Sequence, residues 1–247
     1  MLADPGGEPL SNSTRITALE LAGAHPGDPD KPEVETTAVG RTTVVHRTRY
    51  AARGATLGVM ASLPDVRPRP FSVAEYHRMV DAGILTEDDR VELLEGVIVL
   101  MSPQKDPHAH AIEVLTETLV LQVKGRYRVR PQLPLTIGDG SEPEPDLAVV
   151  PLPDPGSPAL NRRAALLVIE VAGESLRKDR LAKSRIYARA GIPEYWIVNL
   201  EERCIEVSRD PDAEAGVYRT STNALPGDEL RSSAVDGVAV EVGDLFA

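Results

Sequence analysis

The apolar run Leu166–Val171 is interrupted by a carboxylate at Glu170. Its length and its β-branched residues predict a strand that is buried on both faces. An unpaired charge inside such a strand is strongly destabilising or forces protonation. Glu170 therefore needs a cationic partner, which would be either a basic side chain or a metal ion. The alternative is a glutamate near the end of the strand that reaches solvent.

A second carboxylate, Asp146, follows Pro145 and begins the apolar segment Leu147–Val150. Proline fixes its own φ angle and disfavours helix at the residue before it, so this segment starts rigidly as a strand. A rigid acid at a strand edge suits metal binding. The alternative is an ordinary aspartate where a loop meets a strand.

A third group lies on a helix expected over Leu176–Ala190, which ends before Gly191 and Pro193. Asp179, Lys183 and Tyr187 are spaced i, i+4 and i+8 and share a face of this helix. Asp179 and Lys183 would form a surface ion pair worth a few tenths of a kcal/mol, or Lys183 would point over the strand that carries Glu170. The spacing leaves both possibilities open.

The elements that must position these residues alternate between strand and helix. Ser72 and Glu75 form a capping box for a short helix that stops at Gly83. A second, amphipathic helix is expected over His108–Lys124, with Ile112, Leu115, Leu119 and Val123 on one face. Strands are expected at 90–94, 97–101, 127–129, 133–137, 147–150, 164–171, 194–199 and 205–209, with short β segments up to Phe246. This order predicts an α/β (α+β) fold, a mixed β-sheet flanked by helices.

Residues 1–67 differ from the rest of the chain. They are rich in Pro, Gly, Thr and small polar residues and show no sustained apolar period, so we expect a disordered tail. Met60 stands just before the ordered part and is an alternative translation start. Residues 68–247 are expected to form one domain. No run of about 18 apolar residues and no signal-like start occur, which favours a cytoplasmic protein that does not contact a membrane.

Charge and cysteine content limit the function. Residues 68–247 carry 20 Lys and Arg against 30 Asp and Glu, which counts against a nucleic-acid partner. Carboxylates that hold a cation would account for part of this excess, and basic residues are grouped at Lys124–Arg130 and Arg177–Arg189. Cys204 is the only cysteine, which excludes an intramolecular disulfide and a cysteine-rich zinc site.

Five segments, taken in order, resemble the Uma family of proposed restriction endonucleases, within the PD-(D/E)XK nuclease superfamily. They are Val91–Ile98, Met101–Pro103 with His108 after it, Glu142–Val150, Val168–Val171, and the stretch from Asp179 to Val198 that contains Lys183, Tyr187 and Gly191-Ile192-Pro193-Glu194-Tyr195-Trp196. The resemblance runs from about Phe71 to Phe246. Each motif alone is weak, but five in the right order are specific.

The resemblance implies a restriction-endonuclease-like core and a catalytic set of Glu92, Asp146, Glu170 and Lys183. Asp146 takes the place of the D of the PD motif, Glu170 that of the following acid, and Glu92 that of an additional acid. The superfamily pattern places a lysine two residues after Glu170, where this chain has Ala172. Lys183 is the substitute, and Ala172 would leave space for its longer side chain.

The resemblance further implies a metal-dependent endonuclease that hydrolyses phosphodiester bonds in DNA, with DNA as its partner and a homodimer as its assembly. Mg²⁺, with Mn²⁺ as a substitute, would be held by Asp146, Glu170 and Glu92, because hard carboxylate oxygens are the ligands that Mg²⁺ prefers. The alternatives are a catalytically inactive binding or assembly module with the nuclease fold, which the acidic charge and Ala172 favour, and a hydrolase that acts on RNA. His108 and His110 would point apart on a helix, so they are not expected to form a metal pair.

Overall fold

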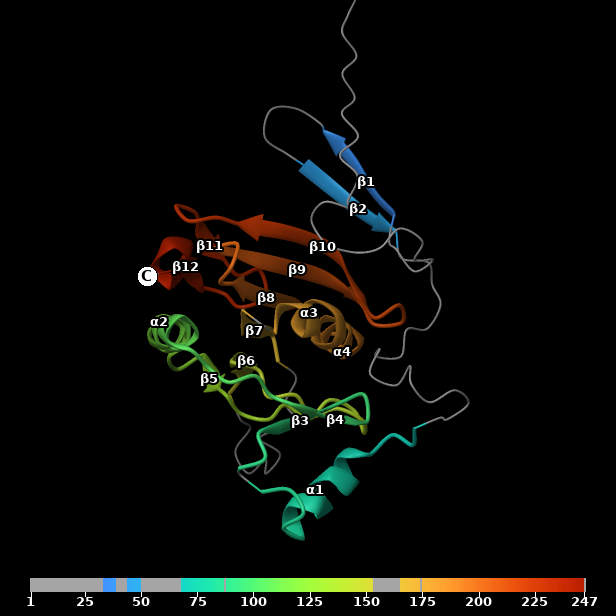
Figure 1. Ribbon diagram of the computed structural model, residues 1–247. Coiled ribbons are helices and arrows are strands. Elements are labelled where there is room, and N and C mark those ends of the chain that lie inside the picture. Colours follow the sequence, from blue (N-terminus) through green and yellow to red (C-terminus); the bar gives the residue numbers. More distant parts are fainter. Residues whose placement is uncertain are drawn as a thin grey trace, which may run out of the picture. The chain divides into compact units, whose positions relative to one another are not determined.

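The computed structural model describes residues 68–86, 88–152, 165–173 and 175–246, together with two strands nearer the N-terminus (Figure 1). The chain divides into two compact units, Met1–Val66 and Arg67–Ala247. In the N-terminal unit, β1 (Glu33–Ala38) pairs antiparallel with β2 (Val44–Arg49). Apart from these two strands, the expected disordered tail and the alternative start at Met60 fall outside the described residues and stay predictions.

A six-stranded mixed sheet forms the centre of the second unit. Its strand order is β10-β9-β8-β7-β6-β5, and only the neighbours β7 and β8 are parallel. The expected mixed sheet is therefore confirmed. The strands are β5 (Tyr127–Pro131), β6 (Leu147–Pro151), β7 (Leu167–Ala172), β8 (Glu194–Asn199), β9 (Cys204–Asp212) and β10 (Val217–Ala224).

Helices cover both faces of this sheet (Figure 1). On one face, α2 (Asp106–Val123) packs with β11 (Glu229–Arg231), β12 (Ala239–Glu241) and the 3₁₀ helix η2 (Val242–Leu245). Its buried side chains are Ala111, Leu115, Leu119 and Val123, spaced as an amphipathic helix requires. On the other face, the helical crossover from β7 to β8 packs Ala182, Ile186 and Tyr187 against the sheet.

A helix and a hairpin precede the sheet in the chain. Helix α1 (Val73–Asp81) begins with the expected capping box, because the Ser72 hydroxyl accepts the Glu75 amide and the Glu75 carboxylate accepts the Ser72 amide. Strands β3 (Val91–Leu94) and β4 (Val97–Leu100) pair antiparallel. Glu95 and Gly96 join them with positive φ angles of 49° and 81°, as a two-residue hairpin turn requires.

One expected strand is wrong, and one expected helix forms within its expected range but with an irregular turn. No strand forms over residues 133–137, where the structure has only an isolated bridge between Ile137 and Ser141. Pro134 lies in that segment and has no amide hydrogen to donate to a ladder. The helix expected over Leu176–Ala190 is not uniform, because a π-helical turn, η1 (Asp179–Lys183), separates α3 (Leu176–Lys178) from α4 (Ser184–Arg189).

None of the helices in the described part of the chain combines the length and the apolar character that crossing a bilayer requires.

Candidate metal and catalytic site

Strand β7 places Glu170 in the interior of the domain. All six residues of the strand are buried, and only 3% of Glu170 is exposed. The carboxylate does not reach solvent at a strand end, so that alternative is wrong. Side chains alternate along a strand, so Glu170 shares a face with Val168 and Ala172, and both of these pack under the helical crossover. The acid therefore faces the helix that follows it in the chain.

Two side chains of that crossover reach one oxygen of Glu170. Lys183 Nζ lies 2.9 Å from Glu170 Oε1, and the Tyr187 hydroxyl donates to the same oxygen at 2.7 Å. Lys183 is 3% exposed, and its ammonium is 4.0 Å from Asp179 Oδ1. Asp179 and Lys183 are therefore paired in the interior, so the ion pair that the spacing allowed does not lie on the surface. Lys183 instead points over the strand that carries Glu170.

The π-helical turn η1 aligns these side chains. In an α-helix each residue turns about 100° around the axis, so Asp179 and Tyr187 would lie about 80° apart. One extra residue in a turn shifts the following residues by about 100°, which reduces that angle to about 20°. The amide of Ser184 accordingly donates to the carbonyl of Asp179, five residues earlier, and the Tyr195 hydroxyl donates to the same carbonyl at 3.2 Å.

Strand β3 brings Glu92 to the same place from a distant part of the sequence. Its Oε2 lies 3.2 Å from Lys183 Nζ, and its Oε1 accepts from Lys178 Nζ at 2.8 Å. The Glu144 amide donates to Oε2 at 3.3 Å. Glu92 is 1% exposed. Lys183 therefore joins the acids of β3 and β7.

Asp146 stands at the start of β6, beside β7. Its Oδ2 accepts the amide of Val171 at 2.7 Å, one residue after Glu170. His108, near the start of α2, places its Nε2 3.2 Å from the same oxygen. His110 turns away and contacts the backbone carbonyl of Asp244. The two histidines do point apart, and His108 belongs to the acid cluster.

Acids outnumber cations in this cluster. Burial raises the pKa of Glu170 to about 8, against the effect of Lys183, and Asp179, Asp146 and Glu92 raise it further. Burial also raises the pKa of Asp179. For Lys183, burial favours the neutral amine, but the surrounding carboxylates outweigh it and raise the pKa. Lys183 is shared among Glu92, Glu170 and Asp179, and Lys178 pairs with Glu92 alone, so the four acids still have a deficit of positive charge that a divalent cation would offset.

The donor set fits Mg²⁺ in its chemistry, since it consists of carboxylate oxygens. Asp179 Oδ1 is buried and has no hydrogen-bond partner among the described residues. The acids are not drawn tightly together, because the Lys183 ammonium lies between Glu92 and Glu170. The fit therefore rests on oxygen donors and excess negative charge.

Another group of possible ligands lies at the start of β9 and in the turn before it. Glu202, Cys204 and Glu206 place their ligand atoms within 4.8 Å of one another, and they are the only such trio in the described ranges. However, Arg180 holds Glu206 through hydrogen bonds of 2.6, 2.9 and 3.2 Å. A cation would have to displace this arginine, so we do not assign a metal to the trio.

The sequence does not predict three members of the cluster. Lys178 stands only within a basic segment, and His108 and Glu144 only within motifs of the resemblance, without a predicted place at the site. Their contacts with Glu92 and Asp146 join segments that lie far apart in the chain. Spacing along one helix or strand carries no signal for such contacts.

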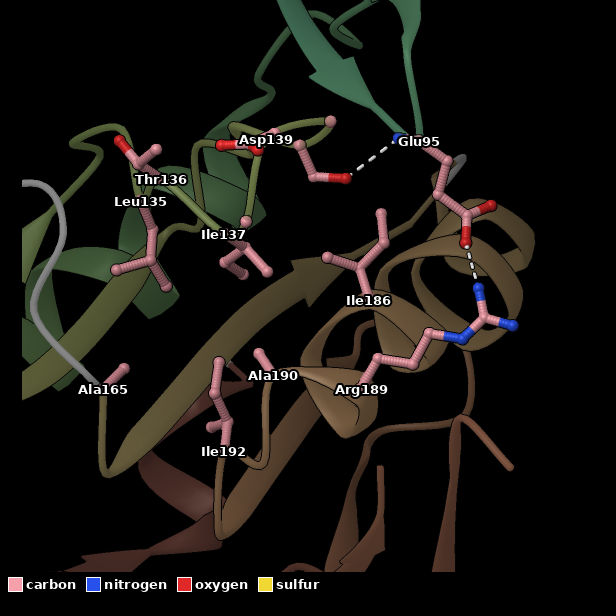
Figure 2. A pocket seen from close by; sticks show the side chains of 13 residues that line it. Glu95, Leu135, Thr136, Ile137, Asp139, Ala165, Ile186, Arg189, Ala190 and Ile192 are labelled. Atoms are coloured by element: carbon pink, nitrogen blue, oxygen red, sulfur yellow. Dashed lines mark hydrogen bonds and ion pairs between the residues drawn. The ribbon is translucent and has the colours of Figure 1, made fainter. Parts of the chain in front are cut away.

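The domain also has a pocket of about 660 Å³ (Figure 2). It is lined by the segment Leu135–Ser141, by Glu95 of the hairpin turn and by the end of α4. Arg189 donates to Glu95 at 3.0 Å across one side of it. None of Glu92, Asp146, Glu170 and Lys183 lines this pocket, so the acid cluster and the pocket are distinct features of the domain.

The fold resembles that of a solved structure, titled as a "putative nuclease belonging to DUF820" from Anabaena variabilis ATCC 29413. The two chains are 17% identical with a TM-score of 0.58, and the match covers 72% of this chain and 98% of the other. This likeness shows the fold.

A search of curated proteins gives no match. A family model described as "Putative restriction endonuclease" matches residues 73–243. The chain therefore belongs to this family, Uma2.

Proposed function

We propose that the protein is a metal-dependent endonuclease that hydrolyses phosphodiester bonds in DNA. The observation that carries this proposal is the burial of four acids around two lysines, Lys178 and Lys183; the acids are Glu92, Asp146, Glu170 and Asp179. Burying carboxylates in excess of cations destabilises a fold. A divalent cation bound at this site would offset the excess negative charge.

In this proposal Asp146, Glu170 and Glu92 hold Mg²⁺, with Mn²⁺ as a substitute. The bound ion would supply Lewis acidity and a water of lowered pKa. Lys183 already bridges two of the three acids, so its ammonium lies where it would orient an attacking water and offset developing negative charge. Tyr187 donates to Glu170 and fixes the direction in which that carboxylate points.

DNA is the proposed substrate because the family description names restriction endonucleases. The excess of acids over residues 68–247 opposes binding to phosphates in general. However, the acids at the site are already paired in part with Lys178 and Lys183. The electrostatic interaction of a substrate at the site would therefore depend on these nearby lysines more than on the net charge of the whole domain.

A binding or assembly module without catalysis is the second candidate. The observation that favours it is the occupation of both Glu92 oxygens by lysine ammonium groups, which leaves no oxygen of this acid free for a metal. A hydrolase for RNA is a third outcome. No described contact distinguishes the two nucleic acids.

The test is cleavage of supercoiled DNA, single-stranded DNA and RNA by the full chain with Mg²⁺ or Mn²⁺. Asp146→Asn and Lys183→Met are purified in the same way, beside Glu117→Gln, which alters an exposed acid of α2. We expect metal-dependent DNA cleavage that the first two substitutions abolish and the third leaves unchanged. Cleavage that survives in Asp146→Asn would identify a contaminating nuclease. A parent protein that binds DNA without cutting would favour the binding module.

We also propose a cytoplasmic location and a homodimer. The homodimer follows from the resemblance to related nucleases. Light scattering on the full chain measures its mass in solution. A monomer at the concentrations that support cleavage would remove the homodimer from the proposal and leave the nuclease in place.

A further inference from the structure

Both carboxylate oxygens of Glu92 are engaged, each by a different lysine. Oε1 accepts from Lys178 at 2.8 Å, while Oε2 lies 3.2 Å from Lys183 and accepts the Glu144 amide at 3.3 Å. A cation that used Glu92 as a ligand would have to take the place of one ammonium. Two positive charges at contact distance repel strongly in a buried site.

The two lysines differ in how firmly they are held. The Lys183 side chain is 4% exposed, and its ammonium also contacts Glu170 at 2.9 Å. The Lys178 side chain is 24% exposed, and the described contacts give it Glu92 as its partner. Lys178 is therefore the more exposed of the two lysines, and its ammonium breaks fewer contacts when it moves. A lysine has a flexible stem of four carbons, so its ammonium can turn outward without a change in the backbone.

We propose that Lys178 exchanges Glu92 for a backbone phosphate of the nucleic acid when a divalent cation enters the cluster. This inference rests on the proposed function. Asp146 is engaged with Val171 and His108, and Glu92 with Lys183. Asp179 has an oxygen without a hydrogen-bond partner among the described residues, but it is buried, whereas the released ammonium turns outward. A phosphodiester group that arrives with the substrate is an anion suited to the released ammonium.

The exchange couples two binding events. Without nucleic acid, a divalent cation must leave the Lys178 ammonium unpaired, so it binds weakly. With nucleic acid present, the ammonium gains a phosphate, so the same cation binds more tightly. Linkage requires the reverse as well, and the cation must tighten nucleic-acid binding by the same factor. Lys178 is in this respect a positioning and substrate-binding residue, whereas Lys183 stays on the two acids.

The experiment measures Mn²⁺ binding to the full chain by electron paramagnetic resonance, with and without a short phosphorothioate duplex that resists hydrolysis. The parent is compared with Lys178→Met, Lys178→Arg and the control Arg177→Met, which removes an exposed neighbouring charge. We expect the duplex to tighten Mn²⁺ binding to the parent about 10-fold, a coupling of about 1.4 kcal/mol. In Lys178→Met, Mn²⁺ alone should bind several-fold more tightly, and the effect of the duplex should vanish.

Lys178→Arg should keep part of the coupling because it keeps the charge, and Arg177→Met should behave as the parent. Separate DNA and RNA duplexes distinguish the two sources of phosphate. Binding of Mn²⁺ that requires Asp146 but is unchanged by Lys178→Met would overturn the exchange and leave the proposed nuclease intact. Absence of Asp146-dependent Mn²⁺ binding, with or without a duplex, would overturn both.

Discussion

Glu170 and Glu194 are two buried glutamates on neighbouring parallel strands, and they are satisfied in different ways. Glu194, which begins β8, is fully buried. Its Oε1 accepts from Trp196 and twice from Arg209, and its Oε2 accepts from Ser232, Ser233 and Ala234 at 2.6 to 3.1 Å. These donors outweigh the effect of burial and lower its pKa. Glu194 thereby joins the C-terminal segment to the sheet.

Glu170 has fewer donors, and the charged one is shared. Lys183 contacts Glu92 and Glu170 together, and Asp179 lies 4.0 Å from the same ammonium. Tyr187 adds one neutral donor. The pKa of Glu170 is accordingly raised to about 8 by burial, whereas the pKa of Glu194 is lowered. Neither side chain is appreciably accessible to solvent, but burial raises the pKa more strongly at Glu170, and Glu194 has the larger set of donors of its own to oppose it.

The contrast indicates which buried acid is structural and which is available to a ligand. A buried charge with a full set of donors gains nothing from an additional cation. A buried charge that shares its only ammonium is still short of positive charge. Metal sites are therefore better sought among poorly satisfied buried acids than among buried acids in general.

The largest expected effect is on folding, from Glu194→Gln. The amide would leave Arg209 without its charge partner and would turn an NH₂ group toward donors such as Ser233, so we expect the free energy of unfolding to fall by about 3–5 kcal/mol. Urea denaturation at neutral pH without metal measures it. Glu170→Gln should stay within about 1 kcal/mol of the parent, because a carboxyl with a pKa of about 8 is mostly protonated at neutral pH and the amide replaces a neutral group. Equal losses in the two variants would show that the acids are satisfied alike.

The next effect concerns metal and reverses the order of the two glutamates. Mg²⁺ at about 100 times its Kd should raise the free energy of unfolding of the parent by about 2.7 kcal/mol, because only the folded chain presents the acids together. The same increment is expected in Glu194→Gln, and none in Glu170→Gln or Asp146→Asn. Thermal unfolding with and without Mg²⁺ measures it. A shift lost in Glu202→Gln instead would place the metal at the trio of Glu202, Cys204 and Glu206.

Sequence patterns predicted much of this contrast but not all of it. The apolar run around Glu170 indicated a buried strand, and the proline before Asp146 indicated a rigid start of β6, because both signals are local. Glu194 begins an equally apolar run, but the sequence does not predict a role for its carboxylate. What separates the two glutamates is the set of donors around them, which come from residues up to 40 positions away.

The π-helical turn shows a second limit of the sequence. Periodicity placed Asp179, Lys183 and Tyr187 on one face of an α-helix, and the structure places all three side chains in the interior. The cause of the alignment is not the expected α-helical spacing. The side chains align because one turn contains an extra residue, and the Tyr195 hydroxyl of β8 donates to the Asp179 carbonyl of that turn. Nothing in the local pattern shows where that residue is accommodated.

The third prediction uses pH. Glu170 has a pKa of about 8 in the folded chain and 4.5 as its ordinary value, so the unfolded chain loses this proton at lower pH. Between these values the folded state binds more protons, and stability falls as pH rises. Without metal, Glu170→Gln should lessen this fall by up to about 1.4 kcal/mol per pH unit. Urea denaturation of parent and variant at about pH 6 and about pH 7 measures it. Parallel slopes would mean that Glu170 is ionised in the folded state already at the lower pH.

The smallest expected effect is that of Tyr195→Phe, which removes one donor from the Asp179 carbonyl of the π-helical turn. The Ser184 amide still donates to that carbonyl, so the free energy of unfolding should fall by only about 1 kcal/mol. Tyr218→Phe is the matched control, since its hydroxyl also donates to a backbone carbonyl, that of Ile192, at 2.9 Å.

Both substitutions should lower stability to a similar degree, but only Tyr195→Phe should weaken Mn²⁺ binding. The reason is that the π-helical turn sets the positions of Lys183 and Tyr187 over Glu170, and a turn that relaxes toward α-helix would rotate Tyr187 away from it. Glu194 has no helix in its set of donors and should be unaffected. Equal Mn²⁺ affinity in the two tyrosine variants would show that the π-helical turn is a packing feature, without influence on the acids that distinguish Glu170 from Glu194.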